Sequence, residues 1–289
     1  MKNFDFCIAG NIFVDNVQIT NAFNVGASNL SISTRDGLGG TFNTAKNLCE
    51  IDSTSEVFLS TTIGHDAQGL YTLEKLNQFK RENKGFDYHA HYDGDKTTTA
   101  IIICEIEKNI RSSIVNWGAC KHSDRFLFPK SKWYHFMYLD TIHGITEETF
   151  KKVPKGSIIS ADFCLPSHSD EEKRRIMKMM KYVDYAILSE DSANSITNQT
   201  IEIYSAMELG ERVKKAAIVH SPKGSFISSA GEEFMCSSEY IDNAKMDVLG
   251  AGDAFAASFI YNASKNSNNL KDNIQWAHRY ATSYIQGDR

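Results

Sequence analysis

From residue 132 onward, the chain alternates short apolar runs with longer amphipathic runs. Four runs rich in β-branched and aromatic residues indicate strands, at 132–139, 157–163, 184–188 and 216–220. The runs between them have helical periodicity, at 146–153, 170–181 and 197–213, the last with Thr197 as its N-cap. Repeated strand, helix and strand units bury a sheet beneath helices. The alternation therefore predicts an α/β fold with a mainly parallel central sheet and helices on both faces.

The amino-terminal part of the chain continues this pattern and adds a second kind of strand. Residues 4–9 and 55–63 are apolar runs typical of buried strands, and residues 70–80 form an amphipathic helix. Residues near 16–34 and 88–117 instead mix β-branched and polar residues with turn formers. These two segments predict short, half-exposed strands that do not belong to the central sheet.

Length and composition limit the classes of protein to which the chain can belong. With 289 residues and 42% hydrophobic content, residues 1–289 can bury the core of one large domain. The net charge is −5 and no run of Lys or Arg is long, so neither a nucleic acid nor a membrane surface is expected as a partner. No signal peptide and no membrane span of ~20 apolar residues is recognisable. Six scattered cysteines without a C-x-x-C pair indicate reduced thiols and a cytoplasmic location.

The stretch DVLGAGDAFAASFIY, residues 247–261, carries the strongest chemical signal in the chain. A glycine-rich turn, Gly250, Ala251 and Gly252, is followed by Asp253 and then by an apolar helical run. A helix points its unpaired N–H groups and the positive end of its dipole at such a turn, which makes the turn an anion site. A carboxylate beside a bound phosphate can take the proton of an attacking hydroxyl. This pattern predicts phosphoryl transfer, with Asp253 as the base.

Polar residues follow the first predicted strand, and another lies in the first turn of the helix after Gly39 and Gly40. Gly10 ends the strand, and Asn11 and Asp15 follow it. Ligands of open α/β sheets gather at the carboxyl ends of strands, so these side chains are candidates for substrate binding. The Gly39-Gly40 pair then gives a tight turn into a helix, with Asn43 in its first turn. An amide offers both donors and an acceptor to a polyol.

These stretches resemble the signatures of the ribokinase-like (PfkB) carbohydrate kinases. Residues 247–253 are similar to the family pattern D-T-x-G-A-G-D, with Val248 in the place of Thr. Residues 39–45 resemble the pattern G-G-x-x-N-x-A, with Thr41 where Gly, Ala or Pro is usual. The resemblance implies a ribokinase-like fold, with the segments near 16–34 and 88–117 forming a small β-sheet lid.

The same resemblance implies ATP-dependent phosphorylation of a hydroxyl on a sugar or sugar derivative, with Mg²⁺. It places the catalytic base on Asp253 and the anion hole on Gly250 to Gly252. The substrate-binding residues that it implies, together with those expected from their position, are Asn11, Asp15, Gly39, Gly40 and Asn43. Whether a monovalent cation assists is left open by the sequence.

On the nucleotide side the chain departs from the family pattern. Where relatives carry N-x-x-E, this chain has Ser189 and Ser192, and the neighbouring Glu190 is then the candidate for contact with Mg²⁺ through water. Residues 221–225 resemble the family's G-x-x-G turn, with Ser221 in the place of the first glycine and Gly224 retained. Ser189, Ser221, Lys223 and Gly224 are therefore the expected nucleotide-binding residues.

The sequence is also compared with three alternatives to a sugar kinase: a nucleoside kinase, an impaired sugar-binding relative and a dehydrogenase. A nucleoside kinase of the same fold would use an aromatic surface such as Phe13, Phe23 or Phe42 for the base. The altered N-x-x-E region leaves open a catalytically impaired relative that binds sugar. A Rossmann dehydrogenase is disfavoured because no G-x-G-x-x-G follows the first strand. Exposed edges of lid strands are compatible with a homodimer. Arg111 lies where many members of the family that the chain resembles have a basic residue in the lid, and the sequence is equally compatible with a solvated side chain.

Overall fold

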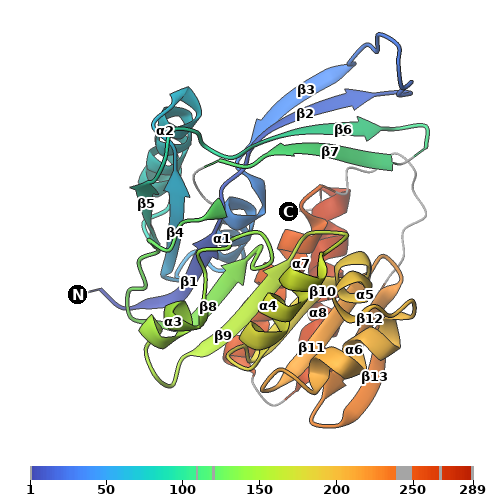
Figure 1. Ribbon diagram of the computed structural model, residues 1–289. Helices are drawn as coiled ribbons and strands as arrows, with labels where there is room; N and C mark the ends of the chain where they lie inside the picture. The colour runs from blue at the N-terminus through green and yellow to red at the C-terminus, as the bar shows by residue number, and fades with distance from the viewer. Residues whose placement is uncertain (1, 109, 119–120, 239–248, 267–268, 288–289) are drawn as a thin grey trace.

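Nine strands form one large sheet in the computed structural model of the chain (Figure 1). The model describes residues 2–108, 110–118, 121–238, 249–266 and 269–287. Asp247 and Val248 of the glycine-rich motif, and Cys120, lie outside the described residues. The strand order is β13-β12-β11-β10-β9-β8-β1-β4-β5. The bounds are β1 Phe4–Gly10, β4 Val57–Ile63, β5 Phe86–Tyr92, β8 Ser131–Met137, β9 Ile158–Phe163, β10 Tyr185–Ser189, β11 Ala216–Ser221, β12 Gly224–Ser229 and β13 Glu232–Ser237.

The sheet is parallel from β5 to β11, and β12 and β13 extend it as an antiparallel hairpin. Side chains alternate between its two faces, so that Phe6 and Ile8 of β1 enter one hydrophobic core while Cys7 and Ala9 enter the other. Both faces are buried, as the near-continuous apolar runs of the sequence require. The prediction of a mainly parallel central sheet is confirmed.

Eight helices cover the two faces within the described residues. One face is packed by α1, α2, α7 and α8, and the other by α3, α4, α5 and α6 (Figure 1). Their bounds are α1 Gly39–Ile51, α2 Ala67–Glu82, α3 Glu147–Lys152, α4 Asp170–Met180, α5 Glu190–Thr197, α6 Glu202–Gly210, α7 Ala251–Lys265 and α8 Leu270–Gln286. Asp66 is the N-cap of α2, and its side chain accepts a hydrogen bond from the Gly69 N–H at 2.9 Å.

A separate sheet of four strands, in the order β3-β2-β6-β7, lies over the edge where β1 ends (Figure 1). Its bounds are β2 Val14–Thr20, β3 Ser33–Gly37, β6 Thr99–Glu105 and β7 Ile110–Asn116. Its inward face has a small core of its own, in which Phe13, Val17 and Ile102 pack together. We call this sheet the lid. A small β-sheet lid was expected, and the structure has one.

One segment assigned to the lid from sequence belongs elsewhere. The expected lid segment began at residue 88, whereas β5 pairs in parallel with β4 at the edge of the large sheet. The reason lies in packing: Phe86 of β5 is buried beneath α2, with its ring 4.9 Å from that of Phe79. The lid takes only β6 and β7 from that part of the chain.

The predicted helix over 197–213 was also wrong. Thr197 is the last residue of α5 rather than an N-cap, and its hydroxyl bonds back to the Ala193 carbonyl at 2.8 Å. Asn198 then adopts a left-handed backbone with φ of 59°, which stops the helix. The next helix, α6, begins only at Glu202.

None of the helices in the described part of the chain is both long and apolar enough to span a bilayer. The five described cysteines are free thiols, which agrees with the sequence expectation for those five.

Candidate active site

The carboxyl ends of the parallel strands and the lid enclose the predicted substrate residues. β1 runs directly through residues 11–13 into lid strand β2, so Asn11 and Asp15 lie where the large sheet and the lid meet. The amino-terminal ends of α1 and α7 point into the same region, because those two helices pack together on one face of the sheet. The fold thus brings together sequence segments more than 200 residues apart.

Helix α7 presents an uncapped amino-terminal end to this region. Its N-cap is Gly250, which has a left-handed φ of 87°, and no side-chain cap bond is made there. The first N–H groups of a helix have no partner within it, and they carry the positive end of its dipole. No side chain of the described residues caps them. An anion is the ligand they suit.

Gly252 has room around it that the protein does not fill. A β-carbon added at Gly252 would meet only the His220 ring, at 3.7 Å, within the described residues. Its φ is not in the left-handed region either. At Gly250, by contrast, an added β-carbon would lie 2.5 Å from the Tyr284 hydroxyl. Packing therefore explains the glycine at 250 but not the one at 252, where the open space fits a bound phosphate.

Asp253 stands in the first turn of α7 and meets the start of α1. Its Oδ2 accepts a hydrogen bond from Asn43 Nδ2 at 2.9 Å. A β-carbon added at Gly40 would lie 2.3 Å from Asp253 Oδ1 and 2.0 Å from the Tyr138 hydroxyl. The missing side chain at Gly40 is thus what allows the carboxylate and the phenol to approach this backbone.

Tyr138 was not singled out from sequence, yet it lies beside Asp253. Its hydroxyl accepts the Gly40 N–H at 2.9 Å, and its ring meets Phe13 edge to face at 5.0 Å. It has a left-handed φ of 57°, which costs a non-glycine residue on the order of 1 kcal/mol. Burial and the negative charge of Asp253 raise its pKa well above the ordinary value of 10. The group is therefore a neutral phenol whose proton can be donated.

Asp15 approaches the same site from the lid. Its side chain is 7% exposed, and it shares the inward face of the lid with Gly37, which pairs with it across β2 and β3. The charge of Arg111 on β7 acts on Asp15 and Asp253 together. Arg111 is exposed, and its charge nevertheless acts on both carboxyl groups of the site.

The carboxyl groups of the site hold their protons more tightly than free carboxyls do. Burial raises the pKa of Asp253 to about 6, against the opposing effects of the Asn43 hydrogen bond and the Arg111 charge. Burial and the charge of Asp253 raise the pKa of Asp15 to about 7. Burial and the charges of Asp253 and Asp140 also raise the pKa of Asp162, at the end of β9, well above 3.8. Such shifts are typical of functional clefts.

Asn11 completes the substrate side of the site. It is fully buried at the end of β1, and its Nδ2 donates to the Thr141 hydroxyl at 3.2 Å. Its Oδ1 has no hydrogen-bond partner among the described residues. A buried acceptor without a partner is costly, so it is expected to receive one from a ligand.

The expected nucleotide residues lie on the neighbouring strands. Ser189 ends β10 and caps α5, accepting the Ser192 N–H at 3.3 Å. It pairs across the sheet with His220, the residue nearest to Gly252, so this edge adjoins the start of α7. Sequence reasoning gave no role to His220, whose position beneath the turn depends on strand register.

The turn that carries Ser221, Lys223 and Gly224 connects β11 to β12. Lys223 is exposed, and its N–H donates to the Ser221 hydroxyl at 3.3 Å. Gly224 has a φ of 144°, and an added β-carbon would lie 2.3 Å from the Cys236 carbonyl oxygen. The hairpin itself therefore requires this glycine.

The structure gives limited support for a metal held by the protein alone. No group of three or more His, Cys, Asp or Glu side chains suited to a metal ion occurs among the described residues. Mg²⁺ bound with nucleotide phosphates needs only one or two carboxylates and keeps several waters. Glu190, whose pKa is raised by burial and by a hydrogen bond with Glu202, supplies such a carboxylate at the start of α5.

Two aromatic residues considered for a nucleoside base are engaged within the protein. Phe13 is 6% exposed and packs against Trp117 and Tyr138. Phe42 packs edge to face on Phe79, with 5.2 Å between ring centroids. Neither ring offers a free face comparable to that of a surface aromatic.

Comparison with known proteins places the chain in a family. The model of the pfkB family of carbohydrate kinases matches residues 10–287. A comparison with curated protein sequences gave no significant match. Among solved structures, a ribokinase from Thermotoga maritima is 18% identical with a TM-score of 0.74, the match covering 99% of this chain and 93% of that one. An adenosine kinase from Sinorhizobium meliloti is 16% identical with a TM-score of 0.76, over 98% and 94% of the two chains. At these identities the likeness shows the ribokinase fold.

Proposed function

This chain belongs to the pfkB family of carbohydrate kinases, and we propose that it transfers the γ-phosphoryl group of ATP to a hydroxyl of a sugar or sugar derivative. In this proposal residues 1–289 act as one domain, in which the lid closes over the acceptor. The observation that carries the proposal is that Asp253, in the first turn of α7, bonds to Asn43 beside the start of α7, whose N-cap is Gly250.

In the proposed reaction Asp253 takes the proton of the acceptor hydroxyl as that oxygen attacks the γ-phosphorus. The bond from the γ-phosphorus to the β,γ-bridging oxygen breaks, and ADP leaves. The N–H groups of Ala251 and Gly252 and the dipole of α7 stabilise the charge on the transferring oxygens. When bound, Mg²⁺ neutralises charge on the nucleotide phosphates, and Glu190 would hold it through water. Ser189, Ser221, Lys223 and Gly224 are assigned to the nucleotide side.

The acceptor is held by groups from three segments. Asp15 and Asn11 supply acceptor oxygens for sugar hydroxyls, and the free Oδ1 of Asn11 supports this role. Asn43 bonds to Asp253 and lies within reach of the same hydroxyl. Gly39 and Gly40 keep the backbone of the α1 start free of side chains, so that the acceptor can approach.

Removal of the Tyr138 hydroxyl is expected to weaken the site without destroying it. The phenol accepts the Gly40 N–H and lies beside Asp253, so Tyr138→Phe leaves that N–H unpaired. The loss of one such bond corresponds to roughly a two- to tenfold fall in kcat/KM for the acceptor. Steady-state kinetics measures this change, with Tyr134→Phe, a tyrosine of the preceding strand β8, as the control. Equal losses in both variants would contradict a specific role for Tyr138.

Activity is expected to rise with pH through the raised pKa values of the cleft. Asp253 acts as a base only when ionised, and its pKa is about 6, so kcat/KM should fall as pH drops below about 6. Asp15, with a pKa of about 7, should extend the rise of kcat/KM to higher pH. A kcat/KM profile between pH 5 and pH 9 measures it. A fall in kcat/KM only near pH 4 would show that the base is an ordinary exposed carboxyl.

Stability is expected to change in the opposite direction. A carboxyl whose pKa is raised in the folded state binds its proton more tightly there than in the unfolded chain. Its stabilising contribution is therefore complete below its ordinary pKa of 3.8 and is lost as pH rises through about 6 to 7. Thermal unfolding across this window measures the effect, and Asp253→Asn should remove part of the slope.

One screen tests the proposed function. Purified protein with ATP and Mg²⁺ is offered hexoses, pentoses, amino sugars and nucleosides, and ADP release is measured. Turnover of a sugar supports the proposal, and turnover of nucleosides alone would replace it with the alternative kinase. Binding of sugars by calorimetry without ADP release would indicate the impaired relative that the altered Ser189 region left open.

The lid also supports a proposal about assembly. Strands β3 and β7 each have one edge without a strand partner in the described part of the chain. Unpaired edges are sites at which a second copy can pair, so we expect a homodimer through the lids. Sedimentation equilibrium tests this, and a monomer across the micromolar range would exclude it.

A further inference from the structure

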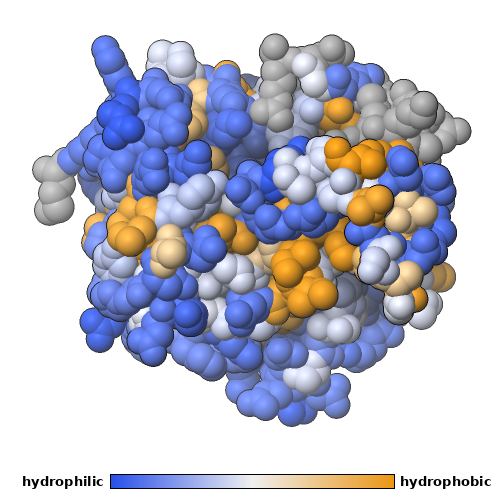
Figure 2. Space-filling view, turned by 90° about the horizontal axis from the view of Figure 1, so that it is seen from above, coloured by the Kyte–Doolittle hydropathy of each residue, from blue (hydrophilic) through white to orange (hydrophobic). Residues whose placement is uncertain are grey.

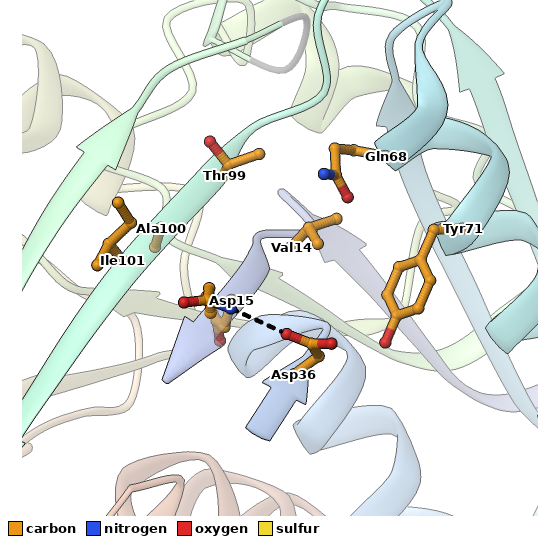
Figure 3. Close-up of a pocket in the computed structure, with 9 residues that line it drawn as sticks. Val14, Asp15, Asp36, Gln68, Tyr71, Thr99, Ala100 and Ile101 are labelled. Atoms are coloured by element: carbon orange, nitrogen blue, oxygen red, sulfur yellow. Dashed lines mark hydrogen bonds between the residues drawn. The ribbon is translucent and has the colours of Figure 1, made fainter. Parts of the chain in front are cut away.

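A second concave site lies on the outer side of the lid, where β2, β3 and β6 face helix α2 (Figure 3). We call it the outer groove. It has a volume of about 410 Å³ and is lined by Val14, Asp15, Asn16, Asp36, Gln68, Tyr71, Thr99, Ala100 and Ile101. That volume is within the range of small-molecule sites. Asp15 is the one lining residue with a role in the proposed phosphoryl transfer, and the strand register turns its side chain to the opposite face of the lid.

Strand register shows that the outer groove is not the acceptor cleft. Asp15 pairs with Gly37 and Ala100 and faces inward, toward the catalytic cleft. Asn16 pairs with Asp36 and Ile101, and successive residues of a strand point to opposite faces. The side chains of the outer groove are therefore on the other face of the lid from the acceptor site.

The groove contains one pair of polar side chains that bond to each other and several polar groups that do not bond to the described protein. Asn16 Nδ2 donates to Asp36 Oδ1 at 3.2 Å, the bond drawn dashed in Figure 3. The Gln68 amide, the Tyr71 hydroxyl and the Thr99 hydroxyl make no hydrogen bond with the protein within the described residues. Figure 3 shows Gln68 and Tyr71 of α2 facing the lid residues across the groove. Amides, a carboxylate and hydroxyls suit a ligand that both donates and accepts hydrogen bonds.

The charge of the groove selects against anions. Among the described residues that line it, none is Lys, Arg or His, and two are carboxylic acids, Asp15 and Asp36. Lys75 stands outside the lining, with its Nζ 5.4 Å from the centroid of the Tyr71 ring. A phosphate or a nucleotide would find no charged partner here. A neutral ligand with many hydroxyl groups satisfies the free donors and acceptors and can pack its C–H face on an aromatic ring.

We propose that the outer groove is an accessory binding site for a neutral saccharide, separate from the acceptor cleft. Val14 and Ile101 supply apolar contact, Tyr71 the aromatic surface, and Gln68, Thr99 and Asp36 the hydrogen bonds. The groove is open to solvent, because Asn16, Asp36 and Gln68 are exposed. The lid side of the molecule is otherwise largely hydrophilic, with separate apolar patches (Figure 2).

Binding is tested in protein whose acceptor cleft has been weakened by Asn43→Ala, in the absence of ATP. Saturation-transfer NMR and calorimetry are run with D-ribose, D-fructose, D-glucose and maltose. At least one saccharide is expected to bind, and Gln68→Ala is expected to weaken its affinity roughly two- to tenfold. Adding Tyr71→Ala should weaken it further. The matched control is Gln78→Ala, which removes an exposed glutamine from the same helix outside the groove, and which should have no effect.

Two results would overturn the proposal. One is that no neutral saccharide binds the Asn43→Ala protein, including the case in which only a cationic amine binds. The other is binding that survives both Gln68→Ala and Tyr71→Ala. Circular dichroism of each variant checks that α2 is intact, and Gln68→Ala alone keeps the test valid if Tyr71→Ala unfolds. Because Gln68 and Tyr71 have no role in the proposed phosphoryl transfer, ATP turnover is measured with Gln68→Ala in protein that keeps Asn43, and normal turnover there separates this inference from the proposed kinase activity.

Discussion

Asp253→Asn is expected to lower kcat by roughly 10²- to 10⁴-fold, the range that one general base contributes. Asparagine keeps the shape of the side chain and can still meet Asn43, but it cannot accept the proton of the acceptor hydroxyl. The loss should fall on kcat rather than on binding, because the start of α7 and the acceptor residues are unchanged. Steady-state kinetics and calorimetric titration with sugar and nucleotide separate the two quantities.

The folded structure should tolerate this change. At pH 8 the buried carboxylate of Asp253 is ionised against its raised pKa, so a neutral amide costs the fold nothing in desolvation. The unfolding midpoint should therefore equal or exceed that of the parent protein. Asp170→Asn, an exposed change in the first turn of α4 on the other face of the sheet, is the control. Near-normal turnover by Asp253→Asn would remove the base from the mechanism.

Much of the fold could be predicted because its signals are local. The strands of the parallel sheet are short apolar runs, and the amphipathic runs between them need no tertiary information to be recognised as helices. The site around Asp253 was predictable for a similar reason, since a glycine-rich turn followed by a helix is itself an anion site. Asn43 could be expected near it because it follows the start of a predicted helix, and Asp15 because it follows the end of the first predicted strand.

The two wrong predictions, for β5 and for the helix over 197–213, concern features that the local sequence pattern does not determine. β5 has the mixed composition of a lid strand, and only the burial of Phe86 beneath α2 assigns it to the large sheet. The helix that Thr197 was expected to cap is interrupted because Asn198 turns left-handed, which asparagine tolerates but does not require.

Tyr138 shows why part of the site could not be predicted. Its hydroxyl reaches Gly40 and Asp253 through a left-handed backbone that a tyrosine rarely adopts. The spacing of residues in the sequence does not predict such a conformation. The position of Arg111 depends likewise on the register of β6 and β7, which sets it opposite Cys104 on the inward face of the lid.

Gly252→Ala is expected to separate stability from activity. Among the described residues the added methyl group meets only the His220 ring, at 3.7 Å, and the backbone is not left-handed, so they leave room for alanine. Alanine also suits a helix better than glycine, by up to about 1 kcal/mol. The unfolding midpoint should hold or rise. The same methyl group would occupy the space in which we place the transferring phosphate, and turnover should fall by roughly 10²-fold or more.

The neighbouring glycine gives the contrast. Gly250→Ala forces a left-handed φ of 87° on alanine and brings its β-carbon to 2.5 Å from the Tyr284 hydroxyl, so it should lose stability as well as activity. Thermal unfolding and ADP release measured on both variants distinguish a glycine kept for the ligand from one kept for the fold. Normal turnover by Gly252→Ala would mean that no phosphate comes close to this turn, and the anion hole would have to lie elsewhere.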